Sequence, residues 1–208
     1  MNVDMNAMKA EIGGAFVLSW MVFGMGPGIG SLGGAIALAV VWMAFSGAHV
    51  LPVVTWSHMM TGNLGDTEGN WMANGMRLAA QAVGALLAIM MVTKFGGHET
   101  GWAATDMWIA DLDGDAVMGA ELGDTGIIGM IAAGAVWWQV HTRCESAWAS
   151  AFGLMVLGGA MTLTGAHEMG ASIGSFGDGI VDTLVNWIFD GLFVGLGALV
   201  GVKIDEML

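Results

Sequence analysis

Charged residues are scarce in this chain, and basic ones are scarcest. Of its 208 residues 11% are charged, with 18 acidic and 5 basic side chains and a formal net charge of −13 at pH 7. A soluble domain carries about a quarter charged residues, so this composition argues against a soluble fold. Five basic residues cannot supply the clustered Lys and Arg that phosphate neutralisation needs. The composition therefore also argues against a nucleic-acid partner.

Cysteine is almost missing as well. Cys144 is the one cysteine, so no disulfide can form within the chain and the redox compartment stays open. A charged leading segment of the secretory type is not apparent either. Asp4, Lys9 and Glu11 lie before or at the very start of the first apolar run, and we therefore expect no cleavable signal peptide.

Apolar and small residues are in excess. Hydrophobic residues make up 56% of the chain, 35 residues are glycine, and the mean hydropathy is +0.71. Transmembrane helices tolerate glycine, because small residues let neighbouring helices approach closely. The pairs Gly191/Gly195 and Gly197/Gly201 have the spacing that is typical of such contacts. These features predict an all-α polytopic membrane protein that is surrounded by a lipid bilayer.

The apolar runs divide the chain into two similar halves. A helix that crosses the bilayer needs about 20 mostly apolar residues, and six runs approach that length: 10–25, 31–46, 76–92, 120–140, 147–163 and 184–202. Two half-length segments, 53–60 and 171–179, each follow the second run of a half, and a short connector is expected at 141–145. We predict a single membrane domain, 1–208, whose halves, 1–97 and 116–208, are joined by the acidic loop 98–115.

Two short motifs recur in the same order in both halves. Ala-Glu precedes a long run at Glu11 and again at Glu121, and Gly-Ala-His follows one at His49 and again at His167. This order predicts an internal duplication. A unit of three spans reverses its direction when repeated, so the two halves would be inverted, as in transport proteins with broken helices that meet at the midplane.

The basic residues predict the orientation. With six spans, four of them fall on the side of both termini: Lys9, Arg77, Arg143 and Lys203. Lys94 falls on the opposite side. The positive-inside rule then predicts a multi-pass protein of the cell membrane with both termini in the cytoplasm and the 98–115 loop outside.

The sequence resembles the aquaporin and glycerol-facilitator family (major intrinsic proteins). Residues 46–55, Ser-Gly-Ala-His-Val-Leu-Pro-Val-Val-Thr, are similar to that family's Ser-Gly-Ala-His-x-Asn-Pro-Ala-Val-Thr, and residues 80–85, Ala-Gln-Ala-Val-Gly-Ala, to its third-span signature. Glu11 and Glu121 resemble its paired glutamates. The resemblance covers nearly the whole chain. It implies six transmembrane helices plus two half-helices in an inverted repeat, and a homotetramer with one pore per subunit.

The departures from the family concern the pore itself. Its two Asn-Pro-Ala motifs correspond to the half-helix tips Leu51, Pro52, Val53 and Met169, Gly170, Ala171. Both asparagines are therefore replaced, and Leu51 and Met169 cannot cap a helix as asparagine does. The family's filter arginine corresponds to Ser172, and the other constriction positions to Ser31, Leu157 and Ala166. The resemblance thus implies a more apolar centre and a wider outer constriction with weaker cation exclusion.

The acidic and histidine residues of the loops have two interpretations each. The resemblance implies that Glu11 and Glu121 accept hydrogen bonds from the loop backbones; otherwise they lie at the headgroup level. His49 and His167 brace the loops by hydrogen bonds, or form a metal pair that lacks a third ligand. Glu168 caps the second half-helix or places a negative charge beside the pore.

Taken together, the sequence predicts a passive channel for water or small neutral, glycerol-like solutes. Two inward-pointing helix N-termini repel cations and suit a neutral, hydrogen-bonding solute. One alternative is a non-conducting structural or accessory subunit with the same fold. Another is a cation or proton pathway that uses Glu168 and the histidines. Because no nucleophile–base pair, metal cluster or phosphate loop has suitable spacing, we expect no enzyme activity, cofactor or metal.

Overall fold

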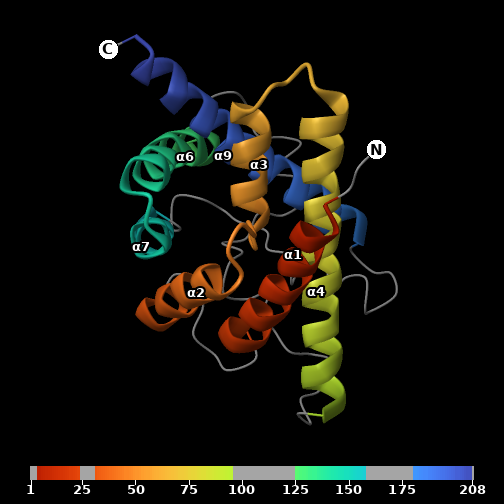
Figure 1. Ribbon diagram of the computed structural model, residues 1–208. Coiled ribbons are helices and arrows are strands. Elements are labelled where there is room, and N and C mark those ends of the chain that lie inside the picture. The colour runs from red at the N-terminus through yellow and green to blue at the C-terminus, as the bar shows by residue number, and fades with distance from the viewer. Residues whose placement is uncertain (1–3, 24–30, 96–124, 158–179, 208) are drawn as a thin grey trace.

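The computed structural model describes residues 4–23, 31–95, 125–157 and 180–207, and every regular element within these ranges is a helix (Figure 1). The all-α part of the predicted fold class is therefore confirmed. The helices of the first half are α1 (Met5–Leu18), α2 (Leu32–Ala44), α3 (Pro52–Thr61) and α4 (Ala73–Phe95), with π-helical turns η1 (Ser19–Phe23) and η2 (Thr67–Met72). Those of the second half are α6 (Thr125–Cys144), α7 (Ala147–Leu157) and α9 (Ile180–Asp205).

Side-chain caps decide where the first helices begin. The Asp4 carboxylate accepts hydrogen bonds from the amides of Asn6 and Ala7, at 2.9 and 3.1 Å, so α1 begins well before the apolar run predicted at 10–25. The Ser31 hydroxyl accepts one from Gly34 N at 3.0 Å and caps α2. Such caps satisfy N–H groups that a helix start leaves unpaired.

Two other boundaries differ from the sequence-based expectation. The third predicted run, 76–92, is extended at its start, because η2 leads into α4 after the Asp66 side chain accepts from Gly69 N at 2.8 Å. The connector expected at 141–145 was wrong for most of its length, since α6 continues to Cys144. His141 and Arg143 occupy the last turn of α6, where basic groups suit the negative end of the helix dipole.

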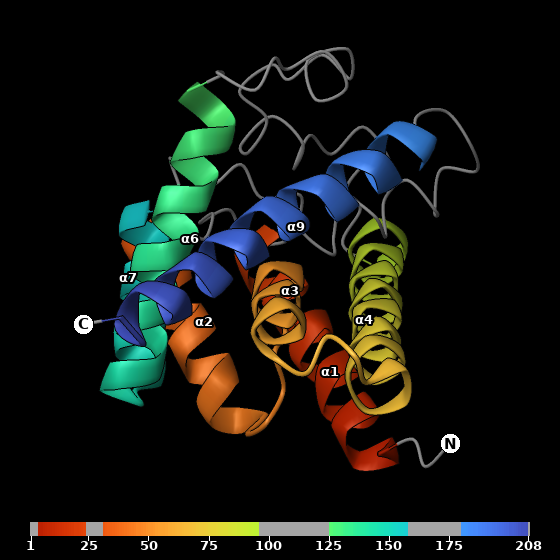
Figure 2. The ribbon, with the colours of Figure 1, turned by 90° about the horizontal axis from the view of Figure 1, so that it is seen from above.

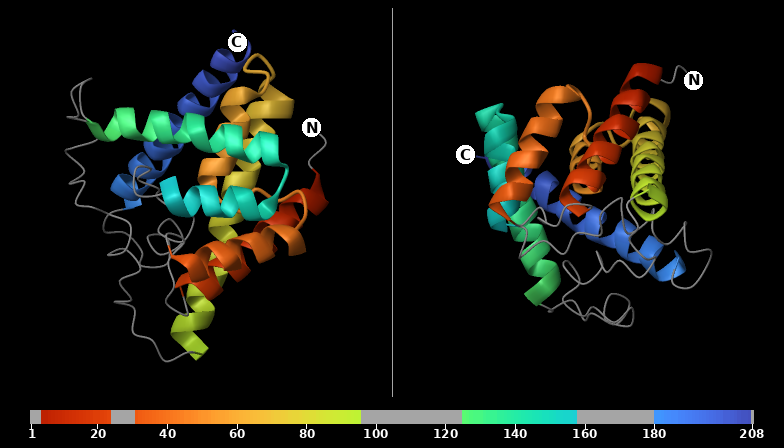
Figure 3. Two further views of the ribbon diagram at one scale, coloured as in Figure 1. Left: turned by 90° about the vertical axis from the view of Figure 1, so that its left-hand side faces the viewer. Right: turned by 90° about the horizontal axis from the view of Figure 1, so that it is seen from below.

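The helices pair in a pattern that repeats in the two halves. Helix α1 packs against α4, and α6 packs against α9, while α2 packs against α7 across the halves. Helix α3 packs against α9 and α4, and it lies between α4 on one side and α6 and α7 on the other (Figures 1 and 3). Figure 2 shows α9 crossing both α6 and α3.

Glycines of α9 allow these crossings. A Cβ on Gly191 would overlap the Trp56 indole of α3, and one on Gly197 would overlap the carbonyl oxygen of Ile131 in α6. A Cβ on Gly195 would likewise lie 2.9 Å from the Trp56 carbonyl oxygen, and one on Gly201 would lie 3.0 Å from Ala135 O. The predicted tight helix contacts are confirmed, and the two glycine pairs contact different helices of the same chain.

Several large apolar side chains are exposed, and several polar side chains are buried beside the apolar core. Large apolar side chains are exposed in a stripe along α2 and another along α4: Leu32, Ile36, Val40, Met43, and Met76, Val83, Leu87, Met90. Polar side chains are buried among the described residues: Glu11, Ser19, Thr55, Ser57, Asn70, Gln81 and Ser150. Of the described helices, the stretch Thr67–Met91 is long and apolar enough to cross a membrane, with 39% of its apolar window buried, and α2 and α7 are apolar but shorter.

The crossing of α9 over α6 predicts a strong effect of one added methyl group. Gly197→Ala lowers the free energy of unfolding by about 1–3 kcal/mol, the usual cost of forcing extra volume into a packed contact. The matched control is Gly75→Ala in α4, where an added Cβ meets nothing within 4 Å. This control stabilises by about 0.5–1 kcal/mol, because alanine favours a helix over glycine. Unfolding in one detergent measures both, and equal effects of the two variants would contradict the packing described.

Candidate functional site

The candidate site is built around the irregular segment between α2 and α3. After Phe45 the chain turns through Gly47, with a φ of +84°, and Val50, with a φ of 66°. A β-branched residue in this left-handed region is a genuine outlier and costs on the order of 1–3 kcal/mol. The surrounding structure must therefore hold Val50 in place, and a buried carboxylate does so.

Glu11 of α1 is fully buried and receives hydrogen bonds from two other parts of the chain, the irregular segment and α4. Its Oε1 accepts from His49 N at 2.7 Å and from Arg77 Nη1 at 2.6 Å. Its Oε2 accepts from Val50 N at 2.8 Å and from Gln81 Nε2 at 2.9 Å. We call these five residues the Glu11 network. Because hydrogen bonds to an ionised acceptor are roughly twice as strong as neutral ones, the network offsets the strain at Val50.

Two side chains of α4 connect the Glu11 network to its surroundings. Arg77 Nη1 also donates to Gly47 O at 2.9 Å, and Gln81 Nε2 also donates to Thr55 Oγ1 at 2.9 Å. The orientation of the Gln81 amide follows from these partners, since both are acceptors and require its NH₂ group. The network therefore joins α1, the irregular segment, α3 and α4.

Three histidines form a stack beside the irregular segment. The rings of His49 and His58 are parallel within 3°, with centroids 4.3 Å apart, and His141 meets the His58 ring edge-on at 5.9 Å. His49 Nδ1 lies 3.1 Å from Thr55 Oγ1, and His141 Nδ1 lies 2.8 Å from Ser150 Oγ. We call His49, His58 and His141 the histidine stack. It brings together the irregular segment, α3 and α6.

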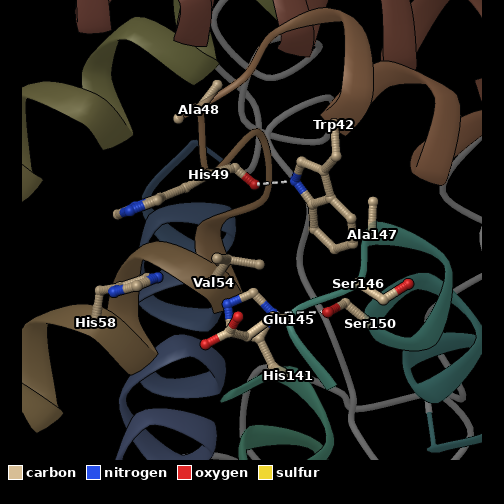
Figure 4. Close-up of a pocket in the computed structure, with 11 residues that line it drawn as sticks. Trp42, Ala48, His49, Val54, His58, His141, Glu145, Ser146, Ala147 and Ser150 are labelled. Carbon is tan, nitrogen blue, oxygen red and sulfur yellow. Dashed lines mark hydrogen bonds between the residues drawn. The ribbon is translucent and has the colours of Figure 1, made fainter. Parts of the chain in front are cut away.

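The histidine stack lines a pocket of about 390 Å³ (Figure 4). The pocket lies between the irregular segment, α3, the end of α6 and the start of α7, and its walls are mixed polar and apolar. Trp42 closes one side, where its indole N–H donates to the His49 carbonyl at 2.9 Å. The lining residues are Trp42, Gly47, Ala48, His49, Val54, His58, His141, Glu145, Ser146, Ala147 and Ser150.

The three imidazoles are uncharged at neutral pH. All three histidines lie outside the six apolar runs that the sequence predicts as membrane spans. Burial and then the neighbouring His58, Arg77 and His141, in that order, together lower the pKa of His49 from 6.5 to about 2. Burial, then His141 and Arg77, lower the pKa of His58 to about 4, and burial also lowers the pKa of His141. Each neutral ring offers one N–H donor and one acceptor nitrogen.

The lining of the pocket indicates which kind of molecule it could bind. Within the described residues no three His, Cys, Asp or Glu side chains are placed to hold a metal ion. The neutral rings, two serine hydroxyls, the Glu145 carboxylate and the apolar side chains of Val54 and Trp42 together form an amphipathic lining. Such a surface can hydrogen-bond a small polar molecule and contact its carbon atoms, as small-molecule pockets generally do.

The residues predicted from the sequence have different places in the structure. Leu51 and Val53, at the start of α3, are buried in the main apolar cluster, against which Leu157 packs, and Pro52 is buried in the first turn of α3. Leu51 makes no side-chain cap. Ser31 caps α2. The remaining predicted site residues lie outside the described residues: Glu121, Ala166, His167, Glu168, Met169, Gly170, Ala171 and Ser172.

Several residues of the site were missed. Arg77 lies one helical turn before Gln81, so both face the same side of α4, and a lone arginine in an apolar helix requires an anionic partner. That signal was available in the sequence. His58 and His141 gave none, because their approach depends on how α3 and α6 cross in space.

Comparison with known proteins adds nothing to this geometry. No model of a protein family matches the chain, and no curated protein matches it either.

The Glu11 network predicts a large cost for removing one charge. Glu11→Gln lowers the free energy of unfolding by about 3–5 kcal/mol, because Arg77 loses its counter-charge in a partly buried place. The NH₂ group of the new glutamine would also face the N–H donors that now point at a carboxylate oxygen of Glu11. Arg143→Gln is the control, because the Arg143–Asp205 pair has both side chains at least half exposed and such pairs contribute about 0–1 kcal/mol.

Chemical unfolding of both variants in the same detergent measures the difference. A cost for Glu11→Gln as small as that for Arg143→Gln would mean that the buried carboxylate does not hold the irregular segment.

Proposed function

We propose that the chain is a passive transmembrane channel for water and small neutral solutes, with the pocket as the inner mouth of its path. One observation carries the proposal: a buried carboxylate holds an irregular backbone segment whose Gly47, Ala48 and His49 line a pocket. In a bilayer, irregular backbone is tolerated where it is buried in protein or lines a wet cavity. The exposed apolar stripes along α2 and α4 support a lipid environment.

The form of α3 also supports this function. It has 10 residues, too few to cross a bilayer, and Pro52 stands at its start, where no N–H is needed. Its N-terminal end is buried and carries roughly half a positive charge, which opposes cations. In the proposed six-span architecture this helix is the first of the two half-helices. The repeated pairing of α1 with α4 and of α6 with α9 is what an inverted duplication would produce.

A second candidate function is favoured by the same helix start. Leu51 and Val53 belong to the main apolar cluster. In addition, the Trp42 indole N–H donates a hydrogen bond to the His49 carbonyl of the irregular segment, so this carbonyl already has a protein partner. An apolar centre of this kind opposes hydration, which fits a non-conducting membrane subunit. Flux through the purified protein decides between the two functions.

The test is osmotic flux in proteoliposomes that contain the purified chain. We expect faster shrinkage than in empty liposomes, with measurable entry of glycerol and urea, because no large or charged side chain narrows the predicted constriction. Ala48→Trp and Ala147→Trp, on opposite walls of the pocket, each lower the flux several-fold. The control Ala79→Trp adds the same side chain on an exposed face of α4 and leaves the flux unchanged.

Flux no faster than in empty liposomes, from protein that unfolds like the native form, would favour the non-conducting subunit. Passage of water alone would contradict the wider constriction. Current under an applied voltage would identify an ion pathway.

A further inference from the structure

One side chain of the pocket has hydrogen-bonding capacity that the described residues do not use. His58 lies on α3, and its ring contacts those of His49 and His141 (Figure 4). The other two histidines of the stack each have Nδ1 within hydrogen-bonding distance of a hydroxyl, Thr55 for His49 and Ser150 for His141. No described residue hydrogen-bonds to either ring nitrogen of His58.

The position of the His58 ring is nevertheless fixed. It is stacked in parallel on His49 at 4.3 Å and meets the Trp138 ring edge-on at 5.0 Å. These contacts hold the ring without using its nitrogens. A preorganised polar group that lines a pocket and lacks a protein partner binds a solute without first having to break a bond within the protein.

We propose that His58 is the residue that selects the solute at the inner mouth, by hydrogen-bonding small neutral molecules that carry hydroxyl or amide groups. This inference rests on the proposed channel function. A neutral imidazole donates through one nitrogen and accepts through the other, which matches a hydroxyl or an amide, since these groups do both. Trp42 and Val54 in the same pocket contact the carbon atoms of such a solute.

The need for His58 depends on how many hydrogen bonds with water a solute must give up. Glycerol carries three hydroxyl groups and loses more hydration in a partly apolar pocket than a water molecule does. An unpaired polar group in such surroundings is costly. The partner that His58 supplies therefore favours glycerol over water, and its removal changes their ratio rather than all fluxes equally.

The experiment compares glycerol and water permeability in proteoliposomes for three variants. His58→Leu removes both nitrogens at similar volume and lowers the glycerol-to-water ratio about fivefold to tenfold, as expected for one lost hydrogen bond. His58→Gln keeps a donor and an acceptor and restores the ratio to within about twofold. Met59→Leu, on the neighbouring residue that packs against Leu78 and Ala82 away from the pocket, leaves it unchanged.

The outcomes separate this inference from the proposed function. If the native chain conducts and His58→Leu keeps the native ratio, the inference is wrong and the channel function stands. If His58→Gln behaves as His58→Leu does, the ring fills space and does not bind solute, which also overturns the inference. If the native chain conducts nothing, both fall together. Thermal unfolding of each variant identifies a change in flux that comes from loss of fold.

Discussion

The interaction on which the rest of the site depends is the burial of the Glu11 carboxylate. An ionised side chain that is removed from water is costly unless paired and hydrogen-bonded, and Glu11 has the Arg77 guanidinium and three further donors around it. Two of these donors are backbone amides of the irregular segment, so the position of that segment is fixed by α1 and α4. Helix α3 then starts at Pro52, and the pocket forms where the segment and α3 face α6 and α7.

The same constraint explains why Val50 keeps an unfavourable conformation. Its left-handed φ turns the His49 and Val50 amides towards one carboxylate. The His49 ring is thereby held within hydrogen-bonding distance of the Thr55 hydroxyl and stacked on the His58 ring. Local strain, the ion pair and the histidine stack are therefore parts of one arrangement, in which the lining of the pocket is set by a residue that does not itself line it.

Part of the site could be predicted from the sequence, and part depends on how the helices pack. Glu11 and His49 were recognised because each stands in a repeated motif, and the start of α3 because Pro52 suits the first turn of a helix. The all-helical fold followed from the apolar runs. The ends of the helices were less predictable, since the caps at Asp4 and Asp66 lie outside those runs. His58 and His141 could not be paired from the sequence, because they meet only through the crossing of α3 and α6, and the second Gly-Ala-His motif lies outside the described residues.

We propose that the exposed apolar faces of α2 and α4 lie in lipid. Spin-label accessibility tests this most directly, since Cys144 is the one native cysteine and can be replaced by serine. Single cysteines are then introduced at Val40 and Val83 on the apolar faces, and at Asn63 in the exposed turn after α3. In liposomes the account predicts frequent collision with oxygen and little with a water-soluble nickel complex at residues 40 and 83, and the reverse at 63. Equal access of the nickel complex to all three positions would contradict it.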